Sequence, residues 1–214
     1  VSERGRDAMV GPTNTRGIKI HAPAKLNLFL EVLSKRDDGF HEIETLMVPI
    51  SLFDTLTFTD ELPGRGSARG NINFSCHWSF SEQSSFSSDL KVSSQADDSE
   101  GSDNLVVKTI QLVRKLAGTE RGATVRLVKR IPTAAGLGGG SSDAAATLLA
   151  ANDVWNLGWS HRRLSAVAAE IGSDVPFFLT RSMAVCRGRG EIVEPLSGLG
   201  DLHAVVVYPP DGLS

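Results

Sequence analysis

The sequence lacks the features that mark membrane-spanning, disulfide-rich and nucleic-acid-binding proteins. No apolar run approaches the roughly twenty residues that cross a bilayer, and residues 1–17 hold no apolar stretch typical of a secretory signal. The two cysteines, Cys76 and Cys186, have no metal-ligand spacing and predict free thiols. The 22 basic and 25 acidic residues give a net charge of −3, which argues against nucleic-acid or membrane-surface partners. We therefore expect a cytoplasmic protein, although a plastid origin stays compatible with the sequence.

The composition changes along the chain. We expect residues 1–17 to be a disordered lead-in and the ordered region to begin at Ile18. Residues 63–102 are dominated by Ser, Gly, Asp and Gln, so they cannot bury enough apolar surface to offset the entropy lost on ordering. We interpret this stretch as a long surface insertion, with room for one short strand around residues 72–76.

Alternation and helical periodicity predict a strand-rich opening followed by helices. Pro23 separates the first two expected strands, and Gly39 is expected to take a positive φ in the turn after them. Ser102 or Asp103 is expected to cap the first helix, which ends near Gly118. The expected strands cover residues 18–22, 26–33, 43–50, 52–58, 123–131, 183–186, 191–194 and 204–208, and further helices cover 142–156 and 160–171.

A glycine-rich segment between an expected strand and an expected helix is the most informative stretch. Residues 131–144 read Ile-Pro-Thr-Ala-Ala-Gly-Leu-Gly-Gly-Gly-Ser-Ser-Asp-Ala. Glycines let a backbone approach phosphate oxygens closely, and the following helix offers free N–H groups and the positive end of its dipole. Ser141 and Ser142 add hydroxyl donors at the same place. The pattern predicts a phosphate-binding loop.

The phosphate-loop patterns of several large enzyme classes do not match the glycine segment. The Walker pattern needs Gly-Lys-Ser/Thr at its end, where this segment has no lysine, and the dinucleotide fingerprint needs a third glycine where Ser141 stands. Protein-kinase catalytic-loop signatures are absent as well. The alternative to a phosphate-binding loop is a flexible linker or a tight turn that binds no ligand. Pro132 before the loop and the Ser-Ser-Asp-Ala helix start weigh against it.

Two further clusters accompany the loop. Residues 23–30 read Pro-Ala-Lys-Leu-Asn-Leu-Phe-Leu, residues 38–41 read Asp-Gly-Phe-His, and residues 172–178 read Gly-Ser-Asp-Val-Pro-Phe-Phe. Together with the loop they resemble the GHMP kinases, named after galactokinase, homoserine kinase, mevalonate kinase and phosphomevalonate kinase. Within that superfamily the chain looks like the 4-diphosphocytidyl-2-C-methyl-D-erythritol kinases of the non-mevalonate isoprenoid route. The resemblance covers most of residues 18–209 outside the insertion.

The resemblance implies a fold and a division into domains. It implies an α+β domain with a mostly antiparallel sheet and helices to one side, which the strand-rich opening also favours. Residues 18–200 would form an N-terminal ATP-binding domain, and residues 201–214 would begin a C-terminal domain that is largely missing. Family members normally run on with a further glycine-rich segment, so we expect either a fragment or a naturally short protein.

The resemblance also implies residue roles. Lys25 and Asp174 fall on the family's catalytic pair. Asn27, Phe40 and His41 fall on substrate-contacting positions, and Phe40 replaces a residue that is often tyrosine, which keeps stacking on cytosine but loses a hydroxyl. ATP is the implied cofactor together with Mg²⁺, whose protein ligands stay unknown. The implied ATP-binding residues are Pro132, Thr133, Ala134, Ala135, Gly136, Leu137, Gly138, Gly139, Gly140, Ser141 and Ser142, with Asn104 and Lys129 near the nucleoside.

These residue types suit the transfer of a phosphoryl group to an alcohol. An alcohol is a poor nucleophile, so a carboxylate such as Asp174 can accept its proton as attack on the γ-phosphate develops. Lys25 can hold Asp174 ionised or offset charge on the transferring phosphoryl group. Taken singly, each has a plainer interpretation: Asp174 as a turn or capping residue, Lys25 as a solvated strand lysine, and His41 as a partly exposed strand histidine.

Three functional hypotheses stay open at this point. The first is ATP-dependent phosphorylation of the 2-hydroxyl of 4-diphosphocytidyl-2-C-methyl-D-erythritol. The second is another GHMP kinase acting on mevalonate, homoserine or a sugar, against which Phe40 and His41 count as a cytosine-reading pair. The third is a truncated, non-catalytic nucleotide-binding module, against which the intact Lys25 and Asp174 count. We expect a small-molecule partner, no nucleic acid or membrane, and a monomer or weak homodimer.

Overall fold

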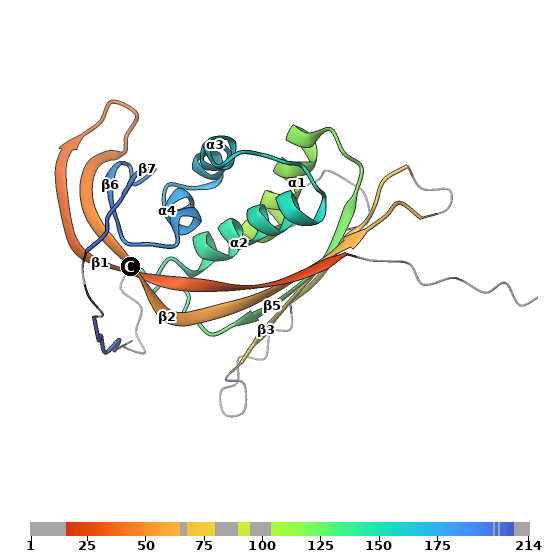
Figure 1. Ribbon diagram of the computed structural model, residues 1–214, viewed down its shortest axis with the longest axis horizontal. Coiled ribbons are helices and arrows are strands. Elements are labelled where there is room, and N and C mark those ends of the chain that lie inside the picture. The colour runs from red at the N-terminus through yellow and green to blue at the C-terminus, as the bar shows by residue number, and fades with distance from the viewer. Residues whose placement is uncertain are drawn as a thin grey trace, which may run out of the picture.

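The described strands form one sheet, and the helices lie together on one of its faces (Figure 1). The computed structural model describes residues 16–64, 68–79, 90–94, 104–198, 200 and 202–207. The strand order is β4-β3-β5-β2-β6-β7, and β1 pairs with β2. Only β3 and β5 run parallel among these pairs, which confirms the expected α+β fold with a mostly antiparallel sheet. The strands are β1 (Gly17–Lys35), β2 (His41–Glu61), β3 (Ile72–Trp78), β4 (Leu90–Ser94), β5 (Gly122–Lys129), β6 (Ala184–Gly188) and β7 (Ile192–Pro195).

β1 and β2 form one long hairpin where the sequence predicts four short strands. Pro23 does not end β1, because β1 pairs only with β2 among the described strands and an edge strand tolerates a residue without an N–H. The pairing register shifts instead between Pro23 and Ala24, and again between Asn27 and Phe29. The expected positive φ at Gly39 is confirmed at 85°. The expected breaks within these strands were wrong, because β1 and β2 continue through them with shifts in the pairing register.

Part of the expected surface insertion belongs to the sheet. β3 runs parallel to β5 and buries Ile72 and Phe74, and β4 pairs with β3. Two apolar residues of this stretch therefore face the core, which the average composition of residues 63–102 conceals. The remaining expectation, of a long surface segment, falls largely on residues 80–89 and 95–103, which lie outside the described residues.

Helix α1 (Leu105–Ala117) begins at a different cap from the two that the sequence suggested. The side chain of Asn104 accepts a hydrogen bond from the Val106 N–H at 2.9 Å and is the N-cap. Asparagine caps as well as serine or aspartate, and Asn104 directly precedes the first apolar residue of the helix. The expected end at Gly118 is confirmed, with φ 60° in the left-handed region.

Helix α2 (Gly139–Val154) is the central helix and is buried on most sides. Its alanines are small enough to let it pack against β1, β2 and helices on either side. Helix α3 (His161–Ile171) has Ser160 as its N-cap and stops at Gly172, within one residue of the expected range 160–171. Helix α4 (Val175–Thr180) was not predicted, because six residues show no helical period, and it buries Phe177 and Phe178. None of the described helices is long and apolar enough to span a membrane.

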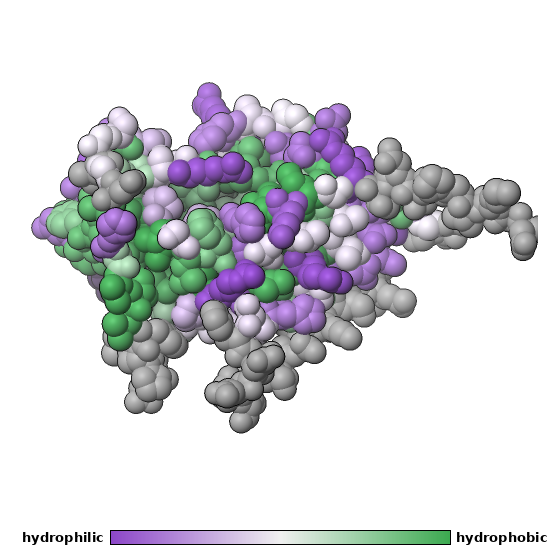
Figure 2. Space-filling model, turned by 60° about the horizontal axis from the view of Figure 1, so that its bottom comes forward, coloured by the Kyte–Doolittle hydropathy of each residue, from purple (hydrophilic) through white to green (hydrophobic). Residues whose placement is uncertain are grey.

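The last described residues do not form the expected strand. Residues 204–207 are coil with exposed side chains, because no described strand pairs with them. Apolar side chains gather at the end of the molecule formed by the β1–β2 hairpin, β6 and β7 (Figure 2). The exposed apolar residues there include Leu28, Leu30, Val32 and Leu33 of β1.

Candidate active site

The glycine-rich segment forms a loop that joins the end of β5 to the start of α2. Gly138 is the N-cap of α2 with φ 68°, and Gly136 has φ 70°. No side chain caps the N-terminus of α2, so the amides of its first turn are left for the backbone, solvent or a ligand. Thr133 and Ala134 lie exposed in the middle of the loop. This is the arrangement with which helix N-termini bind anions.

Two glycines of the loop leave no room for a side chain. A Cβ atom on Gly138 would lie 2.9 Å from Phe178 Cζ and 3.0 Å from Lys25 Cγ. A Cβ atom on Gly139 would lie 3.0 Å from Ile131 Cγ2. A Cβ atom at either position would force neighbouring side chains to shift, so glycine allows the loop to pack closely against β1 and α4.

Lys25 and Asp174 form an ion pair beside this loop. Lys25 Nζ lies 3.4 Å from Asp174 Oδ2, with the lysine side chain 8% exposed and the aspartate side chain 28% exposed. The lysine ammonium also donates a hydrogen bond to Asn27 Oδ1. The backbone N–H of Lys25 donates to the carbonyl of Leu137 at 2.9 Å, which ties β1 to the loop. Residues from three distant parts of the sequence therefore meet in one place.

Asp174 is positioned by two turns. It is the N-cap of α4 and closely follows the α3 stop at Gly172. A Cβ atom on Gly190, in the turn between β6 and β7, would lie 3.4 Å from Asp174 Oδ1, so this turn passes close to the carboxylate. The charge of Asp174 also acts on Cys186 of β6. Burial raises the pKa of the Cys186 thiol to about 11, and the negative charge of Asp174 adds to this rise.

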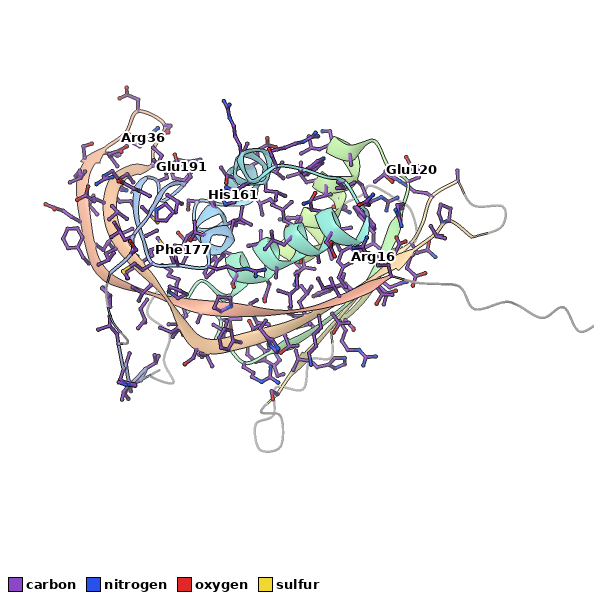
Figure 3. The ribbon with its side chains drawn as sticks, in the orientation of Figure 1. Arg16, Arg36, Glu120, His161, Phe177 and Glu191 are labelled. Carbon is purple, nitrogen blue, oxygen red and sulfur yellow. The ribbon has the colours of Figure 1, made fainter. Side chains whose placement is uncertain are left out.

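Phe40 and His41 lie at the tip of the β1–β2 hairpin. Both are exposed, Phe40 by 53%. Arg189 from the β6–β7 turn stacks on Phe40, with its guanidinium carbon 4.8 Å from the ring centroid. The two turns therefore meet at this end of the molecule, where Figure 3 labels Arg36 and Glu191. Neither Phe40 nor His41 is bonded to the Lys25–Asp174 pair in the described residues.

The two residues expected near the nucleoside both have protein partners. Asn104 caps α1. Lys129 is buried and donates hydrogen bonds to Asp54 and Asp143. Asp54 also accepts a hydrogen bond from the backbone N–H of Ile131 at 2.9 Å, at the start of the loop. This buried ion triad, Lys129 with Asp54 and Asp143, fastens β5, β2 and α2 together beneath the loop.

The triad places two carboxylates beside one ammonium. Burial raises the pKa of Asp143 to about 7; the charge of Lys129 opposes this rise and that of Asp54 adds to it. The pKa of Lys129 is raised as well, because its two carboxylate partners outweigh the effect of burial. Asp143 therefore holds a proton in the folded chain across a pH range in which the unfolded chain would release it.

This protonation makes stability depend on pH in a defined direction. Because the folded-state pKa of Asp143 lies above its ordinary value of 3.8, its contribution is complete below about pH 4 and is lost as the pH rises to about 7. We expect wild type to lose stability relative to Asp143→Asn over this window, as measured by urea unfolding at pH 4 to 8. Asp153→Asn, an exposed site on the same helix, is the control. A stability difference that stays constant with pH would contradict the assignment.

Two buried oxygens at the start of α2 have no partner in the described part of the chain. They are Ser142 Oγ and Asp143 Oδ1, whereas Ser141 is partly exposed. A groove of about 870 Å³ between β1 and α2 is also lined by Ser142. Among the described residues, no group of three or more His, Cys, Asp and Glu side chains is arranged to hold a metal ion.

Sequence reasoning missed Asp54, Asp143 and Thr45. Asp54 shares the inward-facing period of Leu56 on β2, and Lys129 ends the inward-facing period of β5. Opposite charges on the inward faces of two strands were therefore a signal that could have found this pair, because a buried charge needs a partner. Thr45 offered no such signal, since β-branched residues are common in every strand.

Comparison with known proteins shows which family the sequence around this site resembles. Residues 104–182 match the family described as GHMP kinases N terminal domain. This chain contains a GHMP kinase N-terminal domain. A 4-diphosphocytidyl-2-C-methyl-D-erythritol kinase from Pelotomaculum thermopropionicum is 44% identical over 193 residues, which are 90% of this chain and 59% of the relative. A kinase of the same name from Prochlorococcus marinus is 42% identical over 198 residues, which are 92% of this chain and 55% of the relative.

Solved structures agree with this GHMP kinase fold. A crystal structure of 4-(cytidine 5'-diphospho)-2C-methyl-D-erythritol kinase matches with a TM-score of 0.61 and 37% identity, over 84% of this chain and 55% of that one. The Methanococcus jannaschii mevalonate kinase matches with a TM-score of 0.57 at 12% identity, over 86% of this chain and 56% of that one, which shows the shared fold alone. This chain spans 55–59% of the length of these two curated relatives.

Proposed function

We propose that this GHMP domain serves ATP-dependent phosphorylation of the 2-hydroxyl of 4-diphosphocytidyl-2-C-methyl-D-erythritol. The observation that carries the proposal is the Lys25–Asp174 ion pair held against the glycine loop by the hydrogen bond from Lys25 N to Leu137 O. The choice of substrate is supported by the curated relatives at 42–44% identity that bear the name of this kinase. The products are ADP and the 2-phosphate.

The loop would hold the triphosphate of ATP. Backbone amides at its bend and at the start of α2 point where a phosphate could lie, and the helix adds about half a positive charge at this end. The proposed ATP-binding residues are those of the loop, 132–142, with Asn104 and Lys129 near the nucleoside. In this structure Lys129 is engaged by two carboxylates, so its effect on ATP would come in part through the position of the loop.

Mg²⁺ is the metal that ATP chemistry implies. Mg²⁺ prefers oxygen ligands and is usually held by substrate phosphates, waters and one or two protein groups, and when bound it neutralises charge on the phosphates. The buried Ser142 hydroxyl and Asp143 Oδ1, which lack partners in the described part of the chain, are oxygens of the kind that fit. They belong to the fourth and fifth residues of α2, which follows directly on the phosphate loop.

Asp174 and Lys25 would carry the proton and charge movements of the transfer. As the substrate oxygen attacks the γ-phosphorus, Asp174 takes the hydroxyl proton, a new P–O bond forms and the bond from phosphorus to the β,γ-bridging oxygen breaks to release ADP. The ammonium of Lys25 offsets negative charge on the transferring group. The partial exposure of Asp174 leaves its carboxylate open to a ligand, while Lys25 is nearly buried behind it.

The tip of the β1–β2 hairpin would hold the cytosine. Phe40 offers an aromatic face and His41 offers ring nitrogens for hydrogen bonds. Arg189 now stacks on Phe40, so the base would share this ring with the guanidinium or displace it. His41 lies four residues along β2, or about 13 Å of extended strand, from Thr45, which is bonded through Asn27 to Lys25. One elongated ligand would therefore have to span roughly this length between the hairpin tip and the Lys25–Asp174 pair.

The substrate proposal has a direct test. The full-length gene product is expected to release ADP with the cytidine substrate and to show a kcat/KM at least about a hundredfold lower with mevalonate or homoserine, because a site built for polar groups rejects ligands that lack them. A coupled ADP-release assay measures all three. Greater turnover with mevalonate or homoserine would select another GHMP kinase. ATP binding without turnover on any of them would select a non-catalytic nucleotide-binding module. The cytoplasmic location and the monomeric or weakly dimeric state stay predictions.

A further inference from the structure

A chain of hydrogen bonds leads from the ion pair into the buried centre of the sheet. The ammonium of Lys25 donates to Asn27 Oδ1, and Asn27 Nδ2 donates to Thr45 Oγ1 at 2.7 Å. The hydroxyl of Thr45 donates to the carbonyl of Phe29 at 2.6 Å. Three side chains and one backbone carbonyl are thus connected in a single direction.

The direction of this chain fixes which end of the Asn27 amide faces Lys25. A threonine hydroxyl carries one proton, and Thr45 gives it to the Phe29 carbonyl, so towards Asn27 it can only accept. Asn27 must therefore turn its NH₂ group to Thr45 and its oxygen to the ammonium. The flipped amide would direct N–H donors at a cation and would place its oxygen against the Thr45 hydroxyl oxygen, which has no proton left to donate.

Thr45 is more deeply buried than Asn27 and Lys25. It is fully buried and lies on β2, between Leu30 of β1 and Cys186 of β6 in the strand register. The register shift between Asn27 and Phe29 lies beside it. A buried residue in the middle of three strands can fix the orientation of a more exposed neighbour, as a supporting group does at a precise site.

We propose that Thr45 is a positioning residue for phosphoryl transfer, which acts through Asn27 to hold the Lys25 ammonium beside Asp174. The proposal rests on the proposed kinase function. Thr45 itself is not catalytic, because its fully buried side chain cannot touch the substrate.

Two substitutions of opposite character test the role of the hydroxyl. Thr45→Val keeps the volume and removes the hydroxyl, whereas Thr45→Ser keeps the hydroxyl and removes a methyl group. We expect Thr45→Val to lower kcat by about ten- to a hundredfold with the KM for ATP changed less than about threefold, because small displacements of reacting groups cost rates of this order. Thr45→Ser is expected to keep kcat within about threefold of wild type. A normal Thr45→Val with an impaired Thr45→Ser would show a packing role and overturn the proposal.

A double-mutant cycle tests whether Thr45 acts through Asn27. In the Asn27→Ala background, adding Thr45→Val is expected to change kcat by less than about twofold, because the group that Thr45 orients is already gone. Independent, multiplying effects would overturn the proposal. Should Thr45→Val unfold below the assay temperature, Thr45→Cys, with a weak S–H donor, is expected to give a kcat below those of wild type and Thr45→Ser. A wild-type kcat in Thr45→Cys would count against the inference.

The outcomes separate this inference from the proposed function. Turnover of the cytidine substrate by wild type together with a normal Thr45→Val sinks the inference alone. Absence of turnover by wild type on every alcohol tested sinks the proposed function, and the inference with it, because no transfer then depends on Lys25.

Discussion

The Asp174→Asn variant is expected to lose about a hundred- to ten-thousandfold in kcat, which is the range that a general base contributes. Asparagine has the shape of aspartate but cannot accept the hydroxyl proton, and it removes the negative partner of Lys25. ATP affinity is expected to change little, because Asp174 stands beside the loop, at the N-cap position of a different helix from the one that would bind phosphate. Steady-state kinetics give kcat, and a nucleotide titration gives the Kd for ATP.

Glu120→Gln is the matched control for the Asp174 variant. Glu120 is an exposed carboxylate paired with Arg69 and, at 3.5 Å, with Arg114, and Figure 3 shows it well away from Phe177 of α4. The control should keep wild-type kcat and Kd within about twofold, as surface substitutions do. If Asp174→Asn also kept a wild-type kcat, Asp174 would not be the base.

Gly138→Ala is expected to lower kcat/KM by roughly a hundredfold. The new methyl group would meet Phe178 and Lys25 at 2.9 and 3.0 Å, so the loop and Lys25 could no longer keep both of their positions. A displacement of about 1 Å at reacting groups costs a factor of this order. Steady-state kinetics combined with ATP titration show whether the loss lies in binding, in turnover or in both.

Gly118→Ala separates steric contact from backbone strain. Gly118 also has a positive φ, of 60°, but a Cβ atom there would meet nothing within 4 Å. Because the left-handed conformation is strained for alanine, this control should lower the free energy of unfolding by about 1–2 kcal/mol and leave kcat/KM unchanged. Equal kinetic losses in both variants would mean that strain or instability, and not contact with Lys25, causes the effect of Gly138→Ala.

Most of the fold could be predicted because its elements are long and strongly patterned. Alternation along β5, capping at Ser160 and the stop at Gly118 each mark one element by one local rule. The failures have a common cause in tertiary context. Pro23 continues a strand because that strand lies at an edge, and Ile72 joins the sheet because β5 provides a partner, neither of which can be seen in the local sequence.

The candidate site also contains residues that local patterns reveal and residues that only tertiary contacts reveal. The glycine loop, Lys25 and Asp174 carry recognisable local patterns, and the structure brings these three segments together. Thr45 and the Asp54 carboxylate could not be found in this way, because their importance comes from partners that are distant in sequence. Lys129 was assigned to the nucleoside by resemblance, while its contacts in this structure are to two carboxylates under the loop.

A crystal structure of the full-length protein with a non-hydrolysable ATP analogue tests the proposed kinase site most directly. We expect the triphosphate on the backbone amides of residues 136–142, with the γ-phosphate within about 4 Å of the Lys25 ammonium and close to the carboxylate of Asp174. A triphosphate bound elsewhere, for example in the groove between β1 and α2, with Lys25 and Asp174 facing away from it, would contradict this site.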